Sequence, residues 1–144
     1  MLLPLLLLQA AHAAPAACPA DSPLAQFAAG KPTASLPLGQ PVELTVTAGT
    51  DPKRPGKVAT APFAAVNAGI YTFALGEGGW IDVVPAGGKA LESIGHGRSA
   101  CPGVRKLVAF RLVPGTYTFT ATGLSGDAVK AALLAGDLTP KPPR

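Results

Sequence analysis

The sequence has 144 residues, a formal net charge of +4, 17 glycines, 16 prolines and two cysteines. This length predicts one domain, and no stretch reaches the roughly 20 apolar residues that a membrane-spanning helix needs. The charge is too small, and the aromatic residues are too few, to indicate a nucleic-acid partner.

The chain begins with an apolar run, Met1–Leu8, followed by small residues. The Ala11-His12-Ala13 segment fits a signal-peptidase site with cleavage before Ala14, although the usual positively charged start is missing. A buried strand and a membrane anchor are the alternatives. We therefore expect residues 1–13 to be a signal peptide and the mature protein to be periplasmic or secreted.

Residues 14–41 form an arm rich in proline and alanine, a composition that excludes a long helix. Within it, Leu24–Ala29 could form a single helical turn that docks Leu24 and Phe27 on the domain. Cys18 lies in the arm and Cys101 in the body. In an oxidising compartment such a pair indicates a disulfide, with two free thiols or a metal site as alternatives.

Residues 42–136 show the two-residue alternation of half-buried strands, separated by glycine and proline turns, while residues 137–144 read as an extended tail. The motif Gly-x-Tyr-Thr-Phe occurs twice, at Gly69 and at Gly115. The pattern predicts an all-β protein with a single antiparallel, jelly-roll-like β-sandwich. The expected strands are Val42–Thr47, Phe63–Val66, Gly69–Leu75, Trp80–Val84, Lys89–Ile94, Val104–Val113, Gly115–Thr122 and Asp127–Leu134, with an exposed loop at Gly49–Lys57.

We expect Gly69–Leu75 to pair with Trp80–Val84 in a central hairpin, and Gly115–Thr122 to form a second hairpin with Asp127–Leu134. The last segment also carries helix signals, with Asp127 as a possible N-cap, but we favour a strand. The alternation places these side chains inward: Val42, Leu44, Val46, Tyr71, Phe73, Leu75, Ile81, Val83, Val108, Phe110 and Leu112. This phase turns Trp80 and Asp82 outward, and the opposite phase, with Trp80 inside, stays open.

The segments Ala68–Phe73 and Pro114–Phe119 resemble the Gly-x-Tyr strands of bacterial pre-peptidase C-terminal-like domains. That resemblance implies a secreted jelly-roll sandwich, usually non-catalytic and similar in shape to carbohydrate-binding modules. A longer pattern resembles short exported proteobacterial proteins, some of which are labelled homogentisate 1,2-dioxygenase; it comprises Trp80–Val84, His96-Gly97, Cys101–Lys106 and Pro114–Tyr117. The label implies iron held by two histidines and a glutamate, but only His96 survives cleavage of the leader, so no ligand is carried over.

Three groups of residues are candidates for a site. The loop with His96, Arg98, Ser99 and Cys101 gathers reactive side chains, but no third metal ligand or base lies near them in the sequence. Trp80 with Asp82 could form a sugar-stacking platform with a hydrogen-bonding neighbour. Basic residues could form a face for anionic glycans, or simply a solvated surface; they are Arg105, Lys106 and Arg111, with Arg98 and the Lys53, Arg54 and Lys57 loop.

The sequence contains no convincing catalytic set and implies no cofactor and no metal. We expect an exported, non-catalytic module with a structural or binding role in the periplasm or cell envelope, and a glycan or an envelope protein as partner. The alternatives are a carbohydrate or anionic-glycan binding module that uses Trp80 and Asp82 or the Arg105 and Arg111 face, and a metal-dependent enzyme that uses His96 across an oligomer interface.

Overall fold

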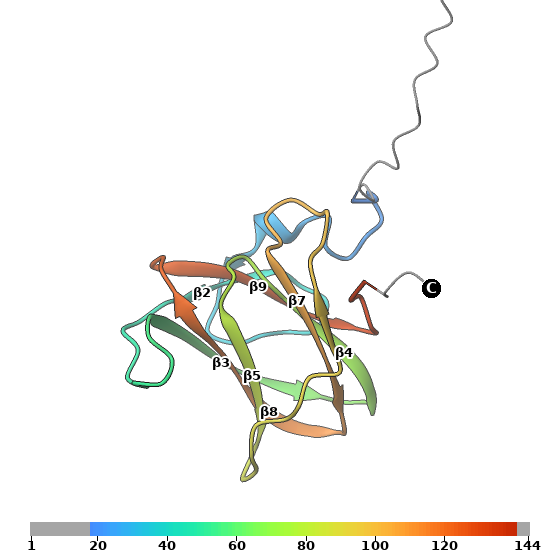
Figure 1. Ribbon diagram of the computed structural model, residues 1–144. Helices are drawn as coiled ribbons and strands as arrows, with labels where there is room; N and C mark the ends of the chain where they lie inside the picture. Colours follow the sequence, from blue (N-terminus) through green and yellow to red (C-terminus); the bar gives the residue numbers. More distant parts are fainter. Residues whose placement is uncertain (1–17, 141–144) are drawn as a thin grey trace, which may run out of the picture.

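The computed structural model describes residues 18–140, which form two packed β-sheets (Figure 1). The six-stranded sheet has the order β1-β2-β9-β4-β7-β6 and the three-stranded sheet the order β3-β8-β5. All neighbouring strands are antiparallel except β1 and β2. The strands are β1 (Lys31–Pro32), β2 (Val42–Thr45), β3 (Lys57–Ala65), β4 (Gly69–Leu75), β5 (Trp80–Pro85), β6 (Gly95–Gly97), β7 (Lys106–Leu112), β8 (Gly115–Leu124) and β9 (Ala128–Ala135).

The all-β sandwich predicted from the sequence is confirmed, but its two hairpins are wrong. β4 pairs with β7 and β9, whereas β5 pairs with β8 in the other sheet. Likewise β8 and β9 lie in different sheets. From β2 to β6, and again from β7 to β9, each connection crosses from one sheet to the other, which is the interleaved order of a jelly roll.

The alternation could not distinguish a hairpin from a crossing, because either arrangement points the same side chains into the core. The four-residue connection Gly76–Gly79 is long enough to cross the roughly 10 Å between packed sheets. The predicted strand at Lys89–Ile94 is also wrong. Only the Leu91 N–H bonds to β5, at 2.9 Å from the Val83 carbonyl oxygen, and the next strand is β6.

The core confirms the predicted inward phase, since every side chain expected inside is buried. The two Gly-x-Tyr-Thr-Phe copies face each other across it, with the Phe73 and Phe119 rings stacked at 5.5 Å. Each tyrosine hydroxyl donates to a carbonyl four residues earlier, Tyr71 to Asn67 at 2.7 Å and Tyr117 to Val113 at 2.5 Å. The repeated motif therefore fixes the turn before each strand as well as filling the centre of the core.

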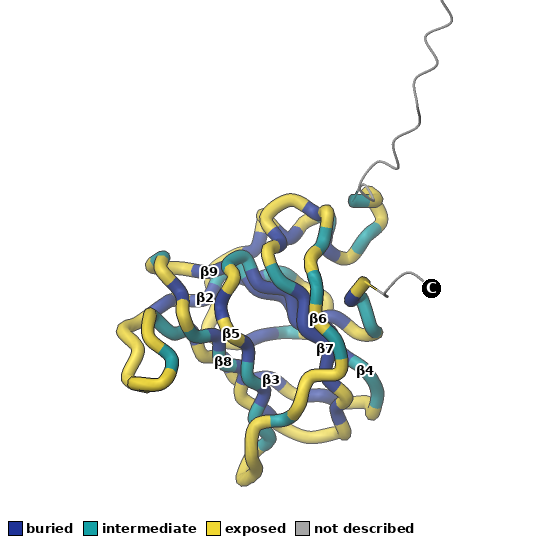
Figure 2. The backbone as a smooth tube through the Cα atoms, viewed as in Figure 1, coloured by how far each residue is buried: buried dark blue, intermediate teal, exposed yellow. Residues whose placement is uncertain are grey.

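The arm covers the outer face of the six-stranded sheet. The turn η1 (Phe27–Ala29) forms where a helical turn was expected, and Leu24 and Phe27 are buried there against Ala74, Leu107 and Ala132. Figure 2 shows β7 and β9 as nearly continuous buried segments for this reason. The strand prediction for Asp127–Leu134 is confirmed by β9, and the helix alternative is wrong.

The arm is tied to the body by the predicted disulfide between Cys18 and Cys101. The first part of the C-terminal tail is held on the same sheet, where Thr72 Oγ1 donates to the Gly136 carbonyl oxygen at 2.7 Å and accepts from the Leu138 N–H at 2.9 Å. The predicted signal peptide lies outside the described residues. Within residues 18–140, no helix is long and apolar enough to cross a membrane.

Candidate functional site

A groove of about 510 Å³ opens along one side of the sandwich, between the free edge of β5 and strands β6 and β7. Beside this edge of β5 the chain makes one backbone hydrogen bond to the strand, from the Leu91 N–H to the Val83 carbonyl oxygen, and then continues to β6 in the other sheet. The apolar floor of this edge groove consists of Ile81, Leu91, Val108 and Phe110. Its polar rim consists of Arg54, Trp80, Asp82, Glu92, Ser93, His96 and Lys106.

Trp80 stands at the rim with 58% of its surface exposed. Its neighbours Ile81 and Val83 point into the core, so the two-residue period of β5 turns Trp80 and Asp82 to the outer face. The outward phase expected from the sequence is therefore confirmed, and the phase with Trp80 inside is wrong. A large aromatic residue in this position leaves more than half of its surface exposed beside the groove.

Arg54 covers part of the Trp80 ring. Its guanidinium carbon lies 4.8 Å from the ring centroid, and Nη1 forms an ion pair with Asp82. A cation over an indole ring contributes about 0.5–1 kcal/mol at an exposed site. The ion pair and the ring contact together fix Arg54 and Asp82 beside Trp80.

The loop that carries Arg54 reaches this position by a close backbone approach. Gly56 has φ of +108°, and a Cβ there would lie 2.8 Å from the Cα of Gly123. Gly79, just before Trp80, is constrained by space alone, because a Cβ there would lie 2.6 Å from the Thr122 carbonyl oxygen. Any larger residue at Gly56 or Gly79 would push the loop or the turn away from Trp80.

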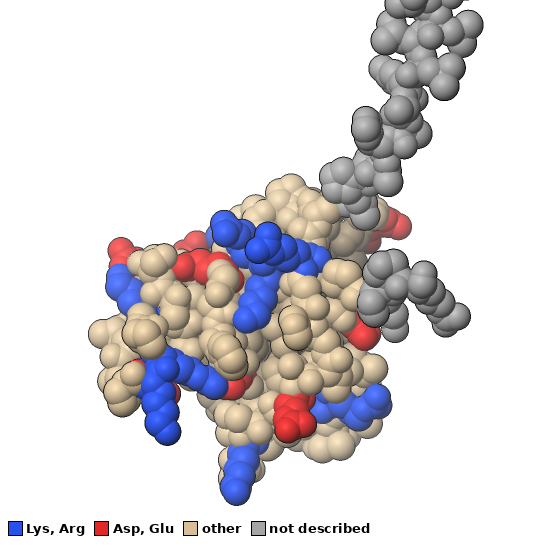
Figure 3. Space-filling model, in the orientation of Figure 1, with Lys and Arg blue, Asp and Glu red and all other residues tan. Residues whose placement is uncertain are grey.

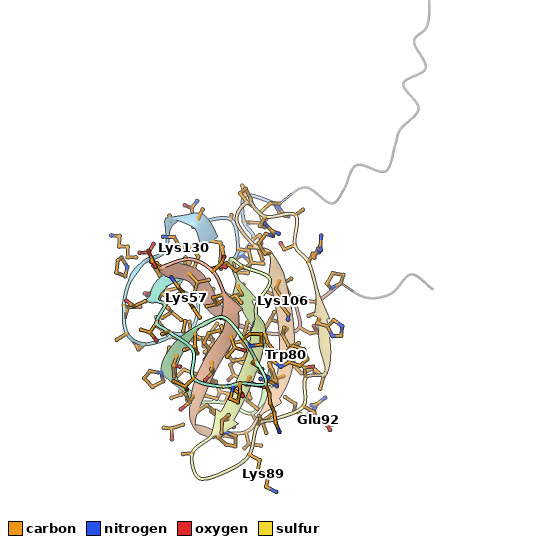
Figure 4. The ribbon with its side chains drawn as sticks, turned by 60° about the vertical axis from the view of Figure 1, so that its left-hand side comes forward. Lys57, Trp80, Lys89, Glu92, Lys106 and Lys130 are labelled. Carbon is orange, nitrogen blue, oxygen red and sulfur yellow. A yellow bond between two sulfur atoms is a disulfide. The ribbon has the colours of Figure 1, made fainter. Side chains whose placement is uncertain are left out.

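Lys106 approaches Trp80 from the six-stranded sheet. Its Nζ lies 5.7 Å from the ring centroid and donates to the Gly79 carbonyl oxygen at 2.8 Å. Lys106 is half-buried, and this burial lowers the pKa of its ammonium group. Figure 4 shows Lys106 and Glu92 on opposite sides of Trp80, so the rim carries a positive and a negative end.

A second hollow of about 290 Å³ lies on the other side of Trp80, over the outer face of β8. Thr122, directly opposite Trp80 in the β5–β8 ladder, lines this hollow. Its buried Oγ1 has no hydrogen-bond partner within residues 18–140. Trp80 therefore forms a ridge between two hollows, with an unsatisfied hydroxyl at its base.

The structure brings together only part of the predicted site. Trp80, Asp82 and His96 line the edge groove, whereas Arg98 lines a separate hollow beside the disulfide. Arg105 and Arg111 are exposed but six residues apart, which along a strand is about 20 Å. On the face of the molecule that Figure 3 shows, the basic side chains form separate groups with other surface between them.

Four residues that line the groove beside Trp80 could not be placed there from the sequence: Arg54, Glu92, Ser93 and Lys106. The sequence predicts Arg54 and Lys106 on a basic face and Glu92 and Ser93 in a strand. Their spacing from Trp80 in the sequence carries no signal, because a crossing loop and the opposite sheet bring them in. Within residues 18–140, no group of three or more His, Cys, Asp and Glu side chains is placed to hold a metal ion.

The fold and this edge site define a jelly-roll sandwich with an aromatic ridge above an open groove. No protein-family model matches the chain, and no curated protein matches its sequence. The resemblance to pre-peptidase C-terminal-like domains therefore stays a prediction, and any function has to be argued from the groove itself.

Proposed function

We propose that this chain is an exported, non-catalytic β-sandwich that binds a saccharide at the Trp80 ridge. The observation that carries the proposal is the exposed tryptophan beside a groove with an apolar floor and a polar rim. The C–H-rich face of a pyranose ring packs on an indole ring, whose π face is negative. The Glu92 carboxylate is then available as an acceptor for sugar hydroxyls, as is Oδ1 of Asp82, whose Oδ2 is bound by Arg54.

The open shape of the groove favours binding over catalysis. Binding modules for long polymers need an open surface along which a chain can extend, and the free β5 edge provides one. The polar residues of the rim are spread along it, and His96 is exposed. An envelope or cell-surface polysaccharide is therefore the partner that this surface fits.

The export part of the proposal is supported by the Cys18–Cys101 disulfide, because such bonds persist in oxidising compartments. Expression of the full-length gene followed by cell fractionation tests it. We expect a disulfide-bonded protein in the periplasm or medium that starts near Ala14. Recovery of the full-length chain in the cytoplasm with both thiols reduced would contradict export.

Binding is tested by affinity electrophoresis and calorimetry on a panel of neutral and acidic polysaccharides. We expect at least one ligand, and we expect Trp80→Ala to abolish its binding. The matched control is Val66→Ala, which removes another exposed apolar side chain, 79% exposed, from a residue that lines neither hollow beside Trp80. Equal binding by Trp80→Ala and the unaltered protein would refute the site, and a panel without any ligand would refute the saccharide.

A further inference from the structure

The charges around Trp80 distinguish between classes of saccharide. Within residues 18–140 the ion pairs are Arg54–Asp82, Lys57–Asp127 and Lys130–Glu43. Lys106 belongs to none of them. Its ammonium group contacts the Gly79 carbonyl oxygen and the Trp80 ring, neither of which carries a compensating negative charge.

Arg54 is not equivalent to Lys106, although both lie against the ring. The charge of the Arg54 guanidinium is already balanced by Asp82. If Arg54 turned away to bind a ligand, the half-buried Asp82 carboxylate would lose its partner. Burial removes part of the water around the Lys106 ammonium group, and no carboxylate among the described residues pairs with it. The charged form of Lys106 is therefore disfavoured. An anion that binds beside Trp80 would relieve this cost, whereas a neutral ligand would not.

The position of Glu92 sets the direction of the ligand. Glu92 lines the same groove but lies on the other side of Trp80 from Lys106, as Figure 4 shows. A negative group at the Glu92 end would be repelled, whereas hydroxyl groups there could donate to its carboxylate. The groove thus fits a ligand with an anionic group at one end and hydroxyls at the other.

We propose that the site selects acidic saccharides, with an anionic group of the sugar bound by Lys106 while its ring packs on Trp80. This inference rests on the saccharide binding proposed above and names its ligand class. The anionic group is a carboxylate in a uronic acid or a sulfate ester, and both offer oxygen acceptors to an ammonium donor. Lysine serves such groups as a point charge with three donors, so the chemistry is common to the two sources.

The test compares polymers that share a backbone and differ in whether they carry charged groups. Calorimetry on the purified protein would use polygalacturonate against its methyl-esterified form, and dextran sulfate against dextran. We expect the charged member of one pair to bind at least about tenfold more tightly, the size of one charge-assisted hydrogen bond. The pair that shows the preference identifies carboxylate or sulfate, and the preference should shrink as salt rises.

Variants then place the anion at Lys106. Lys106→Gln should remove most of the preference, Lys106→Arg should retain it, and Lys89→Gln, an exposed lysine outside the groove, should leave it unchanged. If charged and neutral members bind equally and Trp80→Ala abolishes both, the acidic preference is wrong while saccharide binding stands. If no polymer binds, both proposals fail. A preference that Lys106→Gln and Lys89→Gln reduce equally is a general charge effect and overturns the assignment.

Discussion

The outer face of the six-stranded sheet is covered by another part of the chain, whereas that of the three-stranded sheet is largely exposed. The outward residues of the six-stranded sheet include the small side chains Ala74 and Ala132, which let the arm dock and bury Phe27 to 1% exposure. The outward residues of β8 in the three-stranded sheet are threonines, and nothing among the described residues makes a comparable second core there. The arm thus covers one outer face, whereas the outer face of β8 stays largely exposed.

This contrast explains why Trp80 can be exposed without an evident structural reason. Large aromatic side chains contribute most when they are buried, as the four buried phenylalanines of the sandwich do. On the covered face an outward Trp80 would have been enclosed by the arm. On the face without the arm it remains at the surface, beside the groove at the β5 edge.

The sharpest test of the covered face is Phe27→Ala. We expect a loss of about 4 kcal/mol in the free energy of unfolding, because the change leaves a cavity between the arm and the sheet. Urea denaturation, monitored by Trp80 fluorescence and by circular dichroism, measures this loss. Gln26→Ala, an exposed neighbour in the same turn, is the control and should change stability little. A loss below about 1 kcal/mol would mean that the arm does not belong to the folded core.

The disulfide should have the next largest effect. It links residues 83 positions apart, so its removal releases a long loop in the unfolded chain. We expect the double variant Cys18→Ser, Cys101→Ser to be about 3 kcal/mol less stable. Reduction of the unaltered protein should lower the denaturation midpoint to the same value. A stable double variant that resists proteolysis in residues 18–30 would show that Leu24 and Phe27 hold the arm alone.

Loss of the Glu77 hydrogen bonds, which join the β4–β5 connection to the turn between β8 and β9, should have an intermediate effect on the free energy of unfolding. Glu77 Oε1 accepts hydrogen bonds from the Ser125 N–H and hydroxyl, both at 3.0 Å, and Oε2 accepts one from the Gly126 N–H at 3.4 Å. These bonds, the Ser125 N–H first, lower the pKa of Glu77. Since the folded pKa is below the unfolded one, the stabilisation is complete above the unfolded pKa and is lost as the pH falls through the folded pKa.

Glu77→Gln should therefore cost about 1–2 kcal/mol at pH 7, and the difference from the unaltered protein should shrink by pH 3. Urea unfolding at both pH values measures it. Glu92→Gln removes a carboxylate that makes no hydrogen bond within residues 18–140 and serves as the control. A difference for Glu77→Gln that is constant between pH 7 and pH 3 would show that its charge does not contribute.

The sequence predicted which side chains fill the core but not which strands are neighbours. Alternation along β4 and β5 identifies Phe73 and Val83 as inward whichever sheet each strand joins. Pairing depends instead on contacts between distant segments, such as β4 with β9, which no local pattern records. The same reason explains the ambiguity of β9: both of its faces are buried, so its apolar run loses the alternation that identifies a strand.

The site was predictable to a similar extent. The phase of β5 turned Trp80 and Asp82 outward, and the structure confirms this. The partners of Trp80 were not predictable, because Arg54 comes from a loop whose path depends on the approach of Gly56 to Gly123, and Lys106 from the opposite sheet. The basic residues in the sequence suggested one surface, yet they are distributed among ion pairs, the groove and separate exposed positions.

The smallest effect on stability is expected on the bare face. Trp80→Ala should lower the free energy of unfolding by about 1 kcal/mol or less, because the side chain is mostly exposed and loses chiefly its contacts with Arg54 and Lys106. Circular dichroism during urea denaturation measures this without the tryptophan signal. Together with a complete loss of saccharide binding, this result would separate the two faces cleanly. A loss of several kcal/mol would instead mean that Trp80 supports the fold, and the contrast between a stabilising face and a binding face would no longer hold.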